Sequence, residues 1–182
     1  ALTDEVFARV QAIIDQDPKA KAVYPDLAAM MRRVHARLDA QPARVSFTPK
    51  GASAPVTVVF DGYLVQSLTA FSIADPPGFA KVPITYLALD HGQNEPIAQA
   101  LYGLTQQEFA GFRGMPEAMD LASGVSPKRL ALVREEAKTA LLGDALNFPM
   151  PQILGIRPQI DLGDDFRAPV KSSVPTLFIS GT

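Results

Sequence analysis

The sequence contains no cysteine, which excludes disulfides, thiolate metal ligands and thiol catalysis within its 182 residues. It also lacks any apolar run of the length that spans a membrane. Its 17 basic and 19 acidic residues are interspersed and give a formal net charge of −2. Without a basic stripe, the chain has no obvious means of neutralising nucleic-acid phosphates. We therefore expect neither a membrane nor a nucleic acid among its partners.

Signals for targeting and for cofactors are also missing. The opening residues, Ala1 to Asp4, have neither the basic nor the apolar region of a signal peptide, and nothing else indicates the cellular compartment. The glycine-containing segments lack the strand, glycine loop and helix that cradle a phosphate. Only His35 and His91 are present, and neither has a second histidine at ligand spacing. We expect no cofactor and no metal.

The two histidines receive structural interpretations instead. His35 lies among Arg32, Arg33 and Arg37 on a predicted helix, so we expect it on the solvated side of that helix. His91 precedes Gly92 at the end of another predicted helix, where the helix dipole favours a charged imidazole.

What the sequence does contain is enough apolar material for a core. Hydrophobic residues make up 47% and charged residues 20%, which is typical of a globular chain. Proline occurs 16 times, about twice its usual share. This frequency predicts many short elements with fixed starts and stops.

Apolar residues at helical spacing predict helices over residues 4–15 and 24–41. Further helices are predicted to open after Asp61-Gly62, at Pro83 and at Asn94. Thr105 to Glu108 forms a capping box, which predicts that a new helix begins there. Ser126-Pro127 opens the longest predicted helix, and Gly143 is expected to end it.

Alternating residues predict two strands, over residues 45–48 and 56–60, that form a β-hairpin with a longer loop. Near the C-terminus, Leu177, Phe178 and Ile179 form a continuous apolar run, as in a strand covered on both faces. The predicted fold is therefore mainly α, with one β-hairpin and one C-terminal core strand.

No catalytic residue can be assigned within the chain. Ser123 and Ser180 lie at predicted turns, but both lack the two flanking glycines of a nucleophile elbow. Glu135 and Glu136 are adjacent on a predicted helix and so do not face a common point.

Three segments carry a resemblance. The last nine residues, VPTLFISGT, resemble the strand of α/β-hydrolases that leads to the catalytic aspartate. Residues 22–45 contain Y-P-D-L, an amphipathic helix and R-L-x-x-x-P, and resemble the cap insert of the proline iminopeptidase and tripeptidyl aminopeptidase group. Residues 114–126 are similar to that group's later segment G-M-x5-C-A-E-D-x-P.

The resemblance implies that residues 1–172 form a helical cap, or lid, over the active site of a serine hydrolase. Residues 173–182 would form the core strand that leads to a catalytic Asp beyond Thr182. On this interpretation the chain is an interior part of its parent, with the catalytic Ser upstream and the catalytic His downstream. The parent would act on a small peptide or amide, and the isolated chain would be inactive. The C-terminal strand of the isolated chain would expose an edge through which a homodimer can form.

The resemblance also points to substrate-binding residues. Ser123 stands where the group has the Glu that binds the free amine of the substrate, and Gly124 stands in place of the following Asp. A neutral hydroxyl cannot replace a carboxylate as an anchor for a cation, so nearby Glu117 and Asp120 are the candidate substitutes. Two other hypotheses remain: a stand-alone helical module that binds a partner or peptide, and the cap of an ester or lactone hydrolase.

Overall fold

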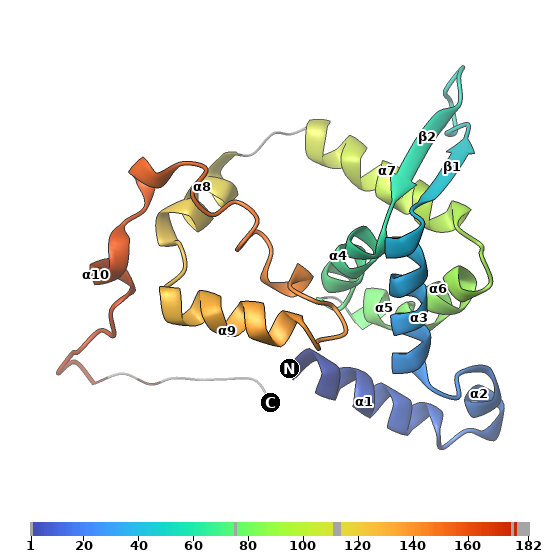
Figure 1. Cartoon of the computed structure of the whole chain (residues 1–182), viewed down its shortest axis with the longest axis horizontal. Coiled ribbons are helices and arrows are strands. Elements are labelled where there is room, and N and C mark those ends of the chain that lie inside the picture. The colour runs from blue at the N-terminus through green and yellow to red at the C-terminus, as the bar shows by residue number, and fades with distance from the viewer. Residues whose placement is uncertain (1, 75, 111–113, 176, 178–182) are drawn as a thin grey trace.

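The computed structural model describes residues 2–74, 76–110, 114–175 and 177. This part of the chain is mainly helical with one β-hairpin, as predicted (Figure 1). The first two thirds contain α1 (Leu2–Ile14), α2 (Pro18–Val23), α3 (Leu27–Ala40), β1 (Ala43–Phe47), β2 (Val56–Phe60), α4 (Gly62–Ser72), α5 (Pro76–Phe79), α6 (Val82–Asp90) and α7 (Glu95–Ala110). The last third contains α8 (Gly114–Ser123), α9 (Pro127–Ala137), η1 (Ala145–Asn147), η2 (Pro158–Ile160) and α10 (Gly163–Arg167).

Side-chain caps fix the starts of several helices. The Asp26 carboxylate accepts the N–H of Ala29 at 2.8 Å at the start of α3, and the Asp61 carboxylate accepts the N–H of Leu64 at 3.0 Å at the start of α4. The short helix α2 was not predicted, although Asp17 and the proline after it supply its start.

The β-hairpin is antiparallel, with Ala43 opposite Phe60 and Phe47 opposite Val56. Burial alternates along both strands, so one face is apolar and covered while the other is exposed. The covered face packs on α7, where the rings of Phe47 and Tyr102 meet edge to face with their centroids 5.8 Å apart. The hairpin therefore lies across α7 (Figure 1).

The predicted helix boundary at Thr105 is wrong, because α7 continues through it to Ala110. The Thr105 hydroxyl donates to the carbonyl oxygen of Tyr102 at 2.8 Å, which is how a threonine inside a helix satisfies its side chain. The packing of Tyr102 under the hairpin holds this part of α7 in place. A capping-box pattern alone could not reveal that contact.

His35 is buried, with 6% of its surface exposed, and the expectation of a solvated histidine is wrong. Met31, Val34 and Leu38 belong to the buried stripe of α3, and positions three or four apart share a helix face. His35 lies four residues after Met31 and three before Leu38, so it points into the core with them. His91, in contrast, is the C-cap of α6, at the helix end where it was predicted.

The last third is attached to the rest through residues 139–145. Leu141, Leu142 and Ala145 are buried, and the N–H of Leu141 donates to the Asp4 carboxylate at 3.1 Å. From α3, Arg32 donates to the carbonyl oxygen of Thr139 at 3.1 Å. The helix that opens at Ser126-Pro127 was predicted to continue to Gly143, but α9 ends at Ala137 and turns follow. The elements α8, α9 and α10 then lie to one side of α1–α7 (Figure 1).

The predicted C-terminal strand lies largely outside the described residues, which omit Thr176 and residues 178–182. Val174 and Leu177 are exposed, and residues 173–175 have no strand pairing. The core strand, and the division of the chain at residue 173, therefore stay predictions.

Candidate functional site

The three residues predicted to bind substrate lie on α8. Glu117, Asp120 and Ser123 are spaced by three residues, which places them along one face of that helix. Glu117 and Ser123 are exposed and Asp120 is half-buried. Within the described residues neither carboxylate forms a side-chain hydrogen bond or an ion pair, so both remain free to bind a cation.

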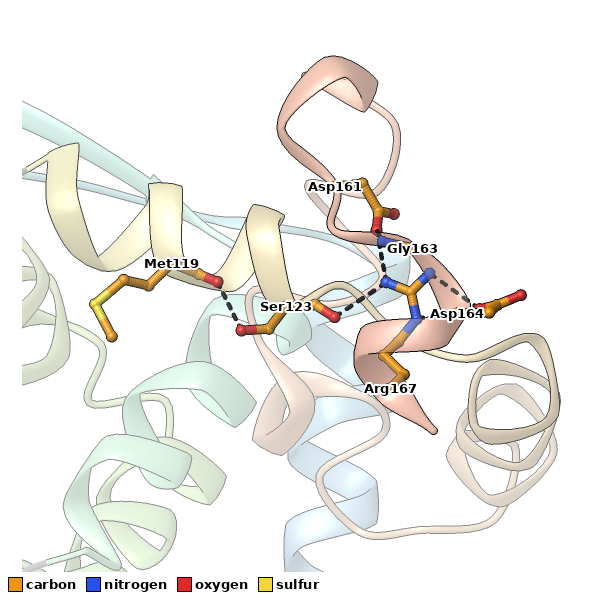
Figure 2. A network of polar contacts seen from close by, with 6 residues as sticks. All are labelled: Met119, Ser123, Asp161, Gly163, Asp164 and Arg167. Carbon is orange, nitrogen blue, oxygen red and sulfur yellow. Dashed lines mark hydrogen bonds and ion pairs between the residues drawn. The ribbon is translucent and has the colours of Figure 1, made fainter. Parts of the chain in front are cut away.

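Ser123 is the last residue of α8, and its polar atoms are already engaged. Its hydroxyl donates to the carbonyl oxygen of Met119 one turn earlier, at 2.8 Å. Its own carbonyl oxygen accepts a hydrogen bond from the Arg167 guanidinium at 3.1 Å (Figure 2). Among the described residues no base contacts the Ser123 hydroxyl, and the side chain beside its carbonyl oxygen is a cation.

Arg167 links the end of α8 to α10. Its guanidinium donates to the Asp161 carboxylate at 2.6 Å and to the Asp164 carboxylate at 3.0 Å (Figure 2). The backbone N–H of Gly163 also donates to Asp161 at 2.8 Å. The Gly163 N–H, followed by Arg167, lowers the pKa of Asp161, and the paired carboxylates raise the pKa of Arg167. We call Arg167, Asp161, Asp164 and the Ser123 carbonyl the Arg167 cluster.

The backbone at Gly124 brings the chain close to this cluster. Gly124 has φ of +57°, and a Cβ atom there would lie 2.5 Å from a terminal nitrogen of Arg167. The adjacent N–H of Leu162 donates to the carbonyl oxygen of Ala122 at 3.0 Å. Glycine at position 124 therefore permits α10 to pack against the end of α8.

A second feature is an open apolar groove beside β2, with a volume of about 490 Å³. We call it the β2 groove. Four of its lining residues, Thr57, Ser67, Tyr102 and Thr105, carry hydroxyl groups, and none of the described lining residues is charged. The apolar lining consists of Val56, Val58 and Val59 on β2, Leu64, Leu68 and Phe71 on α4, and Leu101 and Leu104 on α7. The sequence did not reveal this groove, because residues far apart in the chain form it.

A third feature is the uncovered apolar surface of the last third. Among the described residues of this region, only Val133, Leu141, Leu142 and Ala145 are buried. Large apolar side chains are exposed on every element of the region except η2, and on the connecting segments: Met115, Met119, Leu132, Leu146, Phe148, Leu154, Ile156, Leu162, Phe166 and Val170. An accumulation of exposed large apolar side chains is typical of a surface that packs against another surface.

Two other kinds of site are absent from the described part of the chain. No group of three or more His, Asp or Glu side chains there is placed to hold a metal ion. None of the helices there has both the length and the apolar character needed to cross a membrane.

Comparison with known proteins does not add an identification. No protein-family model, no curated protein and no solved structure matches this chain.

Proposed function

We propose that this chain is the cap region of a serine α/β-hydrolase, which roofs the active site and shapes the access of a peptide or amide substrate. The observation that carries the proposal is the uncovered apolar surface between Met115 and Val170. A cap needs a surface of this kind, because it must pack on the catalytic domain while its own core keeps it folded.

The resemblance of residues 22–45 and 114–126 to the peptidase caps suggests which residues would bind the substrate. In a cap of this group, the α8 face would point toward the amino end of the substrate. Glu117 and Asp120, which have no side-chain partner among the described residues, lie on that face and would bind a free amine by charge pairing. Closing the cap would also exclude water, which strengthens such pairing.

The test uses the complete gene product that contains this chain. We expect it to hydrolyse aminoacyl p-nitroanilides and to react with a fluorophosphonate at one serine outside residues 1–182. The chain alone should do neither, because no serine among the described residues is hydrogen-bonded to a histidine or a carboxylate. Absence of both activities in the complete product, or a stoichiometric adduct on Ser123, would contradict the proposal.

The alternative, a stand-alone peptide-binding module, is favoured by one observation, the β2 groove. The two functions differ in what covers the apolar surface of the last third. Hydrogen exchange on the complete product separates them. A cap predicts slow exchange over α8 and α9 in the complete product and fast exchange in the chain alone, whereas an independent module predicts equal exchange.

A further inference from the structure

The β2 groove follows the edge of a strand. Residues 56–59 of β2 all line it, although successive side chains of a strand point to opposite faces. A groove that contacts four consecutive residues must therefore run beside the backbone and not over one face. On its other edge β2 pairs with β1, and within the described residues the sheet has these two strands alone.

The free edge of β2 offers backbone hydrogen bonds. In an antiparallel pair, alternate residues direct their N–H and C=O groups toward the partner strand and the others direct them away. The outward groups of β2 are therefore available to a chain laid along the groove. Such groups stabilise a bound strand, because each one gains a partner that a purely apolar ligand cannot supply.

The helices beside the edge supply an apolar floor and wall. The side chains of Leu64 and Phe71 on α4 are 38% and 67% exposed, and that of Leu104 on α7 is 37% exposed. Among the described residues no charged side chain lines the groove, so a charged ligand would lose hydration there without gaining a counter-charge from them. The groove thus matches an uncharged ligand with apolar side chains on one side.

We propose that the β2 groove binds an extended, uncharged peptide segment with apolar side chains at alternate positions, which adds to β2 as a third strand. The five residues of β2 correspond to a bound segment of about five residues, roughly 17 Å long. The volume of about 490 Å³ is typical of a site for a small ligand. This binding does not depend on the hydrolase assignment, because it needs no residue outside the chain.

The experiment measures binding of a fluorescein-labelled, capped peptide, Ser-Val-Thr-Val-Thr-Val-Ser, to the full chain by fluorescence anisotropy. Two N-methylated versions carry the same side chains, one methylated at the three valine nitrogens and the other at the nitrogens of the residues that follow each valine. A strand paired with β2 uses one alternate set of its N–H groups. One version should therefore bind at least about tenfold more weakly than the parent, while the other should bind nearly as well as the parent.

Matched variants locate the site. Leu104→Ser and Phe71→Ser remove groove side chains and should weaken peptide binding about tenfold. Ile84→Ser on α6 is the control, because Ile84 is 63% exposed and lies outside the groove, and it should leave binding unchanged. If circular dichroism shows that one groove variant is unfolded, Leu64→Ser replaces it.

Three outcomes would overturn the proposal. They are no binding of the parent peptide, an equal effect of the two methylation patterns, and binding that the groove variants do not alter. Decanoate is measured in parallel. If decanoate binds the groove and the peptide does not, the groove is a site for acyl chains.

Discussion

The Nε2 atom of His35 lies 2.7 Å from the phenol oxygen of Tyr86, and this contact joins α3 to α6 inside the core. The Thr69 hydroxyl donates to the carbonyl oxygen of Val65 at 2.8 Å, so its oxygen accepts the Tyr86 proton over 3.1 Å. With its one proton used, the Tyr86 oxygen must accept from His35 Nε2. The network therefore requires a proton on Nε2 of His35, and in the neutral ring Nδ1 can then accept from the Gln66 side-chain amide at 3.5 Å.

Because His35 is buried, its neutral form is favoured in the folded chain, and we predict that the chain loses stability in mild acid. Burial, opposed by Asp39 and assisted by Arg32, lowers the pKa of His35 from 6.5 to about 4. The unfolded chain binds the proton near pH 6.5 but the folded chain does not. The contribution of unprotonated His35 to the free energy of unfolding is therefore complete above pH 6.5 and is lost as the pH falls toward 4. The loss is at most about 3 kcal/mol in the free energy of unfolding.

Urea unfolding between pH 7 and pH 4.5 tests this prediction. His35→Gln should remove most of the change in unfolding free energy over this range, because glutamine does not titrate. His91→Gln is the control, since His91 is exposed at the end of α6. An unchanged pH dependence in His35→Gln would show that other groups cause it.

A second prediction concerns the hydroxyl of Tyr86, which is buried and bonded on both sides. Burial raises the pKa of Tyr86, so this hydroxyl stays protonated. Tyr86→Phe leaves the Nε2–H of His35 without a partner in the core. We expect it to lower the free energy of unfolding by about 1–3 kcal/mol.

Tyr63→Phe is the matched control for Tyr86→Phe. The Tyr63 oxygen accepts from Gln152 at 2.8 Å, but this bond lies at the surface, where water replaces it. Removing this hydrogen bond should lower the free energy of unfolding by no more than about 0.5 kcal/mol. Equal losses in the two variants, measured by urea unfolding at pH 7, would contradict the assigned network.

Two glycines give a third prediction. Two features oppose a side chain at Gly124. Its φ is +57°, and a Cβ atom there would lie 2.5 Å from a terminal nitrogen of Arg167. Gly124→Ala should destabilise the junction of α8 and α10 by about 1–2 kcal/mol, and the amide of Leu162 should exchange faster. Gly103→Ala changes a helical position with open space around it and should stabilise α7 by about 0.5–1 kcal/mol. Similar effects of the two substitutions would be inconsistent with the described contact.

Local signals made several helix starts and the β-hairpin predictable. Asp26, Asp61 and Ser126 accept backbone N–H groups at helix starts, and each was recognisable from its residue type and position. The alternation along the hairpin likewise set which residues face inward. These features depend on neighbours within about four residues, or on a pattern that repeats along one strand.

The errors came from contacts between distant residues. Nothing near Thr105 in the sequence indicates that Tyr102 packs against Phe47, and this contact belongs to the uninterrupted α7. His35 lies between basic neighbours, yet its partner Tyr86 is 51 residues away. The Arg167 cluster and the β2 groove were missed for the same reason, because each combines elements that only the folded chain brings together.

The last prediction concerns Ser123, and it depends on the proposed hydrolase cap. Ser123→Glu in the complete gene product adds a carboxylate to the α8 face that carries Glu117 and Asp120. A charge-assisted hydrogen bond to the substrate's amine should raise the preference for free over acetylated N-termini by roughly tenfold or more. The preference should fade as the pH rises above the pKa of an α-amine, about 8, because the amine then loses its charge.

Arg167 competes for the new carboxylate, since its guanidinium lies 3.1 Å from the Ser123 carbonyl oxygen. Adding Arg167→Gln to Ser123→Glu should therefore increase the gain in preference for free N-termini. Ser123→Gln, which is similar in shape but uncharged, should leave the preference unchanged. The measurement is kcat/KM for paired free and acetylated p-nitroanilides at pH 6.5 and pH 9. An unchanged ratio in a folded, active Ser123→Glu enzyme would show that this face of α8 does not bind the substrate's amine.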